Sequence, residues 1–164
     1  MPPPRTPPRD AAEALIAVAP LASRWIDRLL AGHEPAITLS QYLVMRAIDR
    51  ERLTAAELAR RSAISGPAVS QLLAGLAALG WVRREPNEAD RRHHALSLSP
   101  EGARAYASAH ELLHRRVGEL LAGLPGPEAD ALGRLLGRVE AALSGVAPPR
   151  RPAPPRPPAP PRRH

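Results

Sequence analysis

The chain has 164 residues, no cysteine, and 23 basic residues against 16 acidic ones, all of the basic residues being arginine, so its formal charge is +7. The lack of cysteine excludes disulfides, thiolate nucleophiles, cysteine-ligated zinc sites and cysteine redox sensors. Two Trp, two Tyr and no Phe argue against a base-stacking single-strand binder, and no apolar run is long enough to span a membrane. We therefore expect a cytoplasmic protein.

The charge is concentrated at the two ends of the chain. Residues 11–145 hold 16 arginines against 15 acids, whereas 14 of the 21 prolines lie in residues 1–10 and 146–164. Repeats of proline and arginine favour extended, solvated chain. We expect a disordered N-terminus over 1–10, a globular domain over 11–145 and a disordered tail over 146–164. The tail is either a solubilising extension or a basic arm that adds phosphate contacts on DNA.

Two helices are predicted first. Apolar residues at steps of three and four indicate a helix over 11–31, and Pro20 inside this pattern is expected to kink the helix or shift its start. A second helix is predicted over 39–50. Its inward face is expected to consist of Tyr42, Leu43, Ala47 and Ile48.

The clearest local signal begins at Thr54. Thr54 and Glu57 fit a capping box, in which each side chain binds the other residue's free backbone N–H. A short helix over about 55–61 should follow, and Ser65 is a good N-cap for the next helix. The inner face of that helix is expected to consist of Val69, Leu72, Leu73 and Leu76. A short helix, a tight turn and a second helix form a helix-turn-helix.

A β-hairpin is predicted next, because segments 81–84 and 95–99 alternate around a polar stretch of turn formers. Two further helices are predicted over about 100–123 and 128–144. These two helices and the first one are too apolar on one side to stand alone. We therefore expect them to pack in a two-fold dimer.

The segments from the helix-turn-helix through the hairpin carry a set of motifs in a fixed order. In the hairpin these are Gly80-Trp81-Val82-Arg83-Arg84, then Asp90-Arg91-Arg92, then Leu96-Ser97-Leu98-Ser99-Pro100-Glu101-Gly102. In the helix-turn-helix they are Leu53-Thr54-Ala55-Ala56-Glu57-Leu58-Ala59 and Ser65-Gly66-Pro67-Ala68-Val69-Ser70. In order and spacing these motifs resemble those of the MarR family of transcriptional regulators, and the match covers nearly all of residues 11–145.

The resemblance implies a mainly α fold with a small β-hairpin wing (α+β): a winged helix-turn-helix with an N- and C-terminal helical dimerisation region. The DNA-binding lobe would span about 39–99, and the dimerisation helices about 11–31 and 100–144. The resemblance further implies a homodimer that binds pseudo-palindromic operators in double-stranded DNA, usually as a repressor. It also implies release by a small aromatic or phenolic ligand held between the dimerisation helices and the DNA-binding lobe.

In such a fold the second helix of the motif lies in the major groove. Its candidate DNA contacts are Ser65, Pro67, Ala68, Ser70 and Gln71. Gln71 can pair with adenine, and Pro67 and Ala68 can touch a thymine methyl. The family often has arginine where Gln71 stands, and no residue from Ser65 to Leu79 is charged. The wing must then contribute more of the binding.

The wing offers three arginines for DNA. Arg91 and Arg92 at its tip are predicted to enter a minor groove or clamp phosphates, and Arg84 is a further candidate. Asp90 is expected to be structural and to pair with an arginine at the hairpin base such as Arg84. Two more arginines, Arg60 and Arg61, can reach backbone phosphates. The alternative for each isolated arginine is an ordinary solvated charge.

The histidines leave two interpretations open. His110 and His114 stand at i and i+4 on the long helix, a spacing that can bind one metal ion. Together with His33 and Glu34 in the first interhelical connection, this spacing keeps a zinc-responsive repressor as an alternative, beside histidines that simply pack near a dimer or pocket surface. For an organic effector the candidate pocket residues are Trp25, His33 and Tyr42, each of which can instead be a core residue. No cofactor is expected.

The main interpretation is thus a ligand-responsive DNA-binding regulator. The alternative is a winged-helix protein-interaction module without operator specificity, whose Pro/Arg tail docks partners in extended form. An enzyme is not expected, because the chain has no Ser/His/Asp order, no phosphate-binding glycine loop and no paired carboxylates in an apolar setting.

Overall fold

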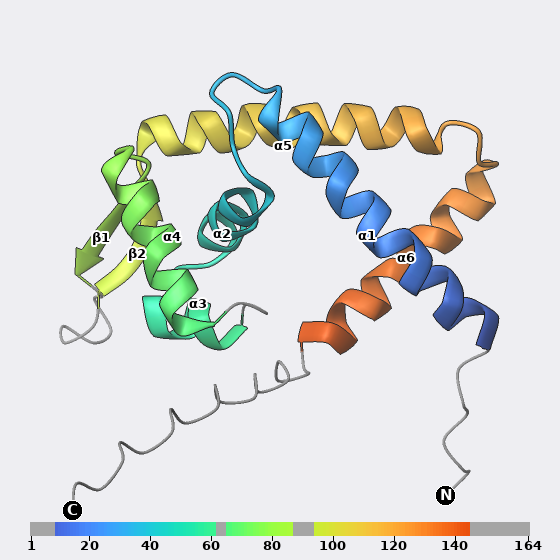
Figure 1. Cartoon of the computed structure of the whole chain (residues 1–164), viewed down its shortest axis with the longest axis horizontal. Helices are drawn as coiled ribbons and strands as arrows, with labels where there is room; N and C mark the ends of the chain where they lie inside the picture. Colours follow the sequence, from blue (N-terminus) through green and yellow to red (C-terminus); the bar gives the residue numbers. More distant parts are fainter. Residues whose placement is uncertain (1–8, 62–64, 87–93, 145–164) are drawn as a thin grey trace, which may run out of the picture.

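A computed structural model describes residues 9–61, 65–86 and 94–144. Within these residues the chain forms six helices and one antiparallel hairpin (Figure 1). In chain order these are α1 (Arg9–Ala31), α2 (Leu39–Arg50), α3 (Ala55–Arg61), α4 (Gly66–Ala78), β1 (Val82–Pro86), β2 (His94–Leu98), α5 (Pro100–Leu121) and α6 (Gly126–Ser144). None of the described helices is both long and apolar enough to cross a bilayer. The elements are those predicted, in the predicted order.

Helix α5 runs along the whole molecule and joins its two parts (Figure 1). The lobe formed by α2, α3, α4 and the hairpin lies at its N-terminal half, whereas α1 and α6 lie below its C-terminal half in this view. The predicted fold class, mainly α with a two-stranded wing, is confirmed.

Caps define where the helices of the lobe begin. The Thr54 hydroxyl accepts a hydrogen bond from the Glu57 N–H at 3.2 Å, and the Glu57 carboxylate accepts one from the Thr54 N–H at 2.8 Å. The predicted capping box is therefore confirmed. Ser65 stands at the N-cap of α4 with an extended backbone, but its side chain makes no capping hydrogen bond. Ser99 caps α5, accepting a hydrogen bond from the Gly102 N–H at 3.0 Å.

The core lies in the lobe and under the first half of α5. Its fully buried members include Leu30, Ile37, Met45, Leu58, Leu76 and Leu96. The predicted inner face of α4 holds, since Val69, Leu73 and Leu76 are buried and Leu72 packs partly against them. On α2 the prediction for Leu43 was wrong. The buried residues are Tyr42, Val44, Met45 and Ile48, a stripe that faces α5 and β2 and leaves Leu43 on the outer side.

Helix α1 continues through Pro20 from Arg9 to Ala31. The alternative in which Pro20 shifts the start of the helix is therefore wrong. The residues around it are exposed, so the cost is a missing backbone hydrogen bond rather than a disrupted core.

The hairpin is longer on its first strand than predicted. β1 pairs with β2 from Val82 opposite Leu98 to Pro86 opposite His94. A third segment joins its edge: Thr54 forms a bridge with Ala95, and the Leu96 N–H donates to the Leu53 carbonyl at 2.8 Å. The link between α2 and α3 therefore lies against the wing.

Candidate nucleic-acid interface

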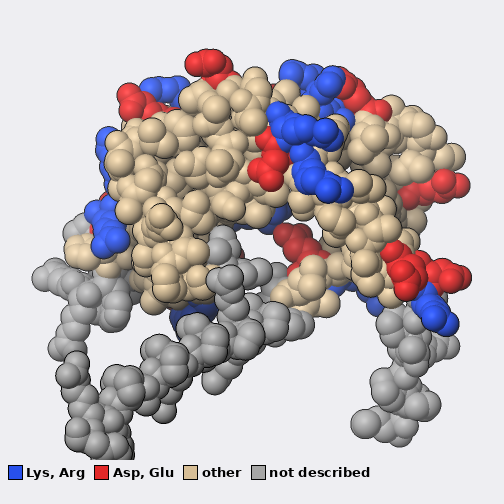
Figure 2. Space-filling view, viewed as in Figure 1, with Lys and Arg blue, Asp and Glu red and all other residues tan. Residues whose placement is uncertain are grey.

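Helix α4 presents small and polar side chains to solvent. Ser65, Pro67, Ser70 and Gln71 are exposed, and Ala68 is half-buried. The opposite face of the helix is buried in the core, which fixes the direction in which the exposed side chains point. Figure 2 shows the surface over α4 free of charged side chains, as its sequence requires.

An open groove of about 320 Å³ runs between α2 and α4. It is lined by Ser40, Gln41, Ala68, Gln71, Leu72 and Gly75. Gln71 is therefore both part of the groove lining and exposed to solvent.

The wing supplies the positive charge that α4 lacks. Arg83 and Arg84 are exposed on β1, a short distance along the chain from α4. Arg91 and Arg92, the predicted tip contacts, lie outside the described residues, as does Asp90 with its predicted pairing to Arg84. Arg84 lies in the middle of β1, opposite Leu96, and its contact with DNA stays a prediction.

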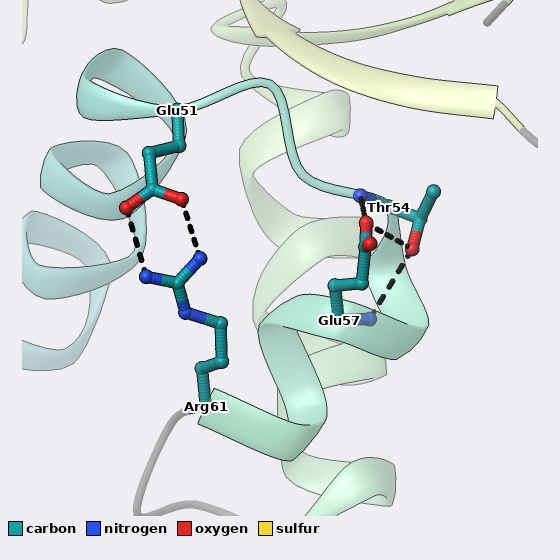
Figure 3. A network of polar contacts seen from close by, with 4 residues as sticks. All are labelled: Glu51, Thr54, Glu57 and Arg61. Atoms are coloured by element: carbon teal, nitrogen blue, oxygen red, sulfur yellow. Dashed lines mark hydrogen bonds and ion pairs between the residues drawn. The ribbon is translucent and has the colours of Figure 1, made fainter. Parts of the chain in front are cut away.

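Side chains of the segment between α2 and α3, residues 51–54, contact the start and the end of α3 (Figure 3). Glu51 forms a two-pronged ion pair with Arg61 at the end of α3, with one N–O distance of 2.8 Å. The Arg61 hydrogen bond lowers the pKa of Glu51, and Glu51 raises that of Arg61. Hydrogen bonds from Thr54 lower the pKa of Glu57. Arg61, a sequence candidate for phosphate contact, is therefore already occupied by Glu51.

The next residue in this segment reaches the wing. Arg52 lies 2.9 Å from a carboxylate oxygen of Glu85 on β1, and the Ser97 hydroxyl on β2 donates to the other oxygen at 2.8 Å. Sequence reasoning missed Glu85, because a glutamate beside a polar stretch looks like ordinary hairpin surface. Nothing in the sequence around Glu85 indicates that it pairs with Arg52 and Ser97.

Between α2 and α5 lies a cluster of aromatic rings, which we call the Tyr–His cluster: Tyr42, Tyr106, His110 and His114. Its ring centroids are 5.7 Å apart for Tyr42 and Tyr106 and 5.4 Å for Tyr106 and His110. The Tyr42 hydroxyl lies 2.7 Å from Nδ1 of His110. Burial raises the pKa of both tyrosines. His110 contacts the other three rings, and Tyr106, which sequence reasoning did not propose as a site residue, packs against both Tyr42 and His110.

Two arginines of α2 lie at the edge of this region. Arg46 and Arg50 are 3.7 and 3.8 Å from a carboxylate oxygen of Glu140 on α6. Their charges lower the pKa of Tyr42, against the larger effect of burial. Aromatic rings next to guanidinium groups suit the recognition of an aromatic anion.

The other two predicted pocket residues lie apart from this cluster. His33 Nδ1 is 2.9 Å from the Pro35 carbonyl, which can only accept, so Nδ1 carries the proton and Nε2 accepts from the Ser108 hydroxyl at 2.9 Å. His33 thus fastens the α1–α2 connection to α5. Trp25 is half-buried on α1, and among the described residues no ring contact joins it to the Tyr–His cluster.

The two histidines of the predicted metal site, His110 and His114, lie in contact. The His110 and His114 rings meet edge to face with centroids 4.7 Å apart. Over residues 9–61, 65–86 and 94–144, no three His, Asp or Glu side chains come together in a way that could hold a metal ion. His33, the proposed third ligand, is engaged by Pro35 and Ser108 instead.

Comparison with known proteins gives the same fold. The sequence profile of the MarR family matches residues 37–93. An uncharacterized HTH-type transcriptional regulator of Mycobacterium bovis is 30% identical over 115 residues, which are 68% of this chain and 80% of the relative. The solved structure of the Multiple Antibiotic Resistance Repressor, MarR, superposes with a TM-score of 0.67 at 26% identity, covering 82% of this chain and 96% of that one.

A mutant of MarR from E. coli has been solved in complex with operator DNA. It superposes on this chain with a TM-score of 0.61 at 28% identity, covering 77% of this chain and 93% of that one. The helix-turn-helix, the adjoining hairpin and the exposed face of α4 define a winged helix-turn-helix protein, a class that binds DNA. Within this class, the chain belongs to the MarR family and is a transcriptional regulator.

Proposed function

We propose that the chain is a homodimeric repressor that recognises pseudo-palindromic operators in double-stranded DNA and is released by a small aromatic or phenolic ligand. The observation that carries the proposal is the geometry of α4, whose buried face leaves Ser70 and Gln71 exposed on the opposite side. In this proposal Gln71 contacts a base edge, and the rest of the surface that faces the DNA major groove consists of Ser65, Pro67, Ala68 and Ser70.

The wing contributes affinity more than base recognition. Arg84, Arg91 and Arg92 contact phosphates or a narrow minor groove, and Asp90 shapes the tip. Because α4 carries no charge, these arginines supply most of the salt-dependent binding. The solved complex of a MarR mutant with operator DNA supports DNA binding by this chain through the likeness of the two folds.

Dimerisation rests on the apolar residues that the single chain leaves in solvent. Large hydrophobic side chains of three helices are about half or more exposed: Leu15, Ile16, Val18 and Leu21 on α1, Leu120 on α5, and Leu135, Leu136 and Leu143 on α6. An exposed apolar surface of this extent marks an interaction site. A second copy buries it and presents two copies of α4 to the two halves of a pseudo-palindrome.

The effector site is placed at Tyr42, next to Tyr106 and His110. This region joins α2 of the DNA-binding lobe to α5, so a ligand there can bias the position of the lobe. Arg46 and Arg50 share one carboxylate, that of Glu140, so the two guanidinium groups keep an excess of positive charge for an acidic ligand. Titration with benzoate and with phenol, followed by intrinsic tryptophan fluorescence, compares an anionic with a neutral aromatic probe; Tyr42→Phe should weaken whichever binds.

The central test is selection of duplexes from a random library by the full chain. The proposal expects a pseudo-palindromic consensus. Gln71→Ala should relax preference at one position of each half-site, whereas Arg84→Ala should weaken all sequences alike and reduce the salt dependence. If no sequence is enriched and binding disappears at physiological salt, the alternative of a winged-helix protein-interaction module takes the place of this proposal.

A further inference from the structure

The wing is tied to the segment before α3 by side chains from three segments. Arg52 precedes α3 by a few residues, Glu85 lies on β1, and Ser97 lies on β2. One carboxylate oxygen of Glu85 is 2.9 Å from Arg52, and the other accepts a hydrogen bond from Ser97 at 2.8 Å. Both oxygens are thus engaged, each by a different element.

The backbone of the same segment supports the other strand. The Leu53 carbonyl accepts from the Leu96 N–H at 2.8 Å, and Thr54 bridges to Ala95. Residues 52–54 therefore hold β2 through the backbone and β1 through the Arg52 side chain. Because a two-stranded ribbon is only marginally stable by itself, its orientation depends on such contacts.

We propose that Arg52 and Glu85 are positioning residues for DNA binding. Their ion pair, braced by Ser97, fixes the wing relative to α3 and α4, so that the wing arginines and the groove-facing side chains of α4 engage one duplex together. This inference rests on the proposed DNA recognition, and it assigns Arg52 to the wing rather than to phosphate contact.

The position of Glu85 in the sequence supports this role. Glu85 directly follows Arg83 and Arg84, the exposed arginines of β1. A carboxylate so close to a DNA-facing strand repels phosphate, unless its charge is offset by a neighbouring cation. Arg52 provides that offset, and holding the strand in one geometry lowers the ordering cost that DNA binding would otherwise incur.

The decisive variant is Glu85→Ala, because two explanations predict opposite changes in its affinity for DNA. Simple electrostatics expects removal of a negative charge near DNA to strengthen binding. The positioning role expects weaker binding to the selected duplex, by about five-fold, with little change for a scrambled duplex. Glu101→Ala removes a carboxylate at the exposed start of α5 and serves as the matched control, in which affinity stays equal or rises.

A double-mutant cycle with Arg52→Ala tests whether the two residues act through one another. The combined variant should bind the selected duplex no more weakly than Arg52→Ala alone. The charge-swapped chain, Arg52→Glu with Glu85→Arg, should recover part of the loss. Thermal unfolding of each variant is measured beside binding, and it should change little because an ion pair whose side chains are 70% and 44% exposed contributes little to stability.

The inference is overturned if Glu85→Ala binds the selected duplex as well as the wild-type chain or better, or if the two single losses add in the double variant. It is also overturned if the loss of binding follows a matching loss of thermal stability. Failure of the proposed function is distinct, because the wild-type chain itself would then select no sequence.

Discussion

The Tyr42 hydroxyl lies 2.7 Å from Nδ1 of His110 and joins α2, the first helix of the DNA-binding lobe, to α5. When Nε2 of His110 carries the proton, the hydroxyl donates to Nδ1. Burial is the main cause that lowers the pKa of His110, and the charges of His114, Arg46 and Arg50 lower it further, while Asp49 opposes them. The folded protein therefore favours the neutral imidazole.

We predict that stability falls in mild acid and that His110 contributes to this fall. A histidine whose pKa is lower in the folded state binds protons more readily when unfolded. Its contribution is therefore complete above its ordinary pKa of 6.5 and is lost as the pH falls below that value. Urea unfolding between about pH 5 and pH 7.5 should show a smaller pH dependence for His110→Gln than for the wild-type chain.

The exposed His94 on β2 provides the control. His94→Gln should retain the wild-type dependence on pH in the same experiment. A His110→Gln chain that loses stability in acid as steeply as the wild type would show that another group is responsible.

A second prediction concerns the close approach of α5 to the start of the wing. A Cβ atom at Gly102 would lie 2.8 Å from the carbonyl carbon of Trp81 and closer still to its oxygen. That oxygen accepts the Ser99 N–H at 2.9 Å, so backbone on both sides must shift. Gly102→Ala should lower the free energy of unfolding by about 3 kcal/mol, measured by urea denaturation.

Gly75 on α4 is the matched control for this substitution. A Cβ there meets nothing within 4 Å. Gly75→Ala should therefore raise the free energy of unfolding by about 0.5–1 kcal/mol through helix propensity alone. Equal effects at the two positions would contradict the packing argument.

Local signals account for what the sequence predicted well. The capping box of Thr54 and Glu57 involves residues three apart, and helix geometry brings them together whatever the rest of the chain does. The inner face of α4 and the two strands follow from periodicity in the same way. Pro20 shows the limit of a single-residue rule, since α1 continues through it.

The choice of partner across the fold was not predictable. Glu51 and Arg61 are ten residues apart, and Arg52 and Glu85 are 33 apart. With 16 arginines and 15 acids over residues 11–145, spacing alone cannot say which pairs meet. The contact of Tyr106 with Tyr42 was not predictable for the same reason, because the sequence of α5 does not reveal which residue of α2 lies opposite.

The pairing of Arg61 leads to a third prediction. A guanidinium held at two points by Glu51 contributes no net charge to a phosphate contact. The neutral pair variant Glu51→Gln with Arg61→Gln should therefore keep its affinity for the selected duplex and its salt dependence. Arg84→Ala should instead reduce the slope of log affinity against log salt by about 1, the value expected for one phosphate contact.

Binding is compared at several salt concentrations for all three chains. If the slope of the pair variant drops as far as that of Arg84→Ala, Arg61 exchanges Glu51 for a phosphate when DNA binds. The sequence assignment of Arg61 to the DNA backbone would then be restored.

The last prediction tests the dimer through two leucines of equal exposure. Leu136 on α6 and Leu79 at the end of α4 are each 51% exposed in the single chain. If α6 lies in a dimer interface, Leu136→Asp places an unpaired carboxylate in an apolar contact and should weaken association at least about ten-fold. Leu79 lies in the DNA-binding lobe, so Leu79→Asp should leave association unchanged. Sedimentation velocity over a range of protein concentrations distinguishes these outcomes, and a wild-type chain that sediments as a monomer throughout would contradict the dimer itself.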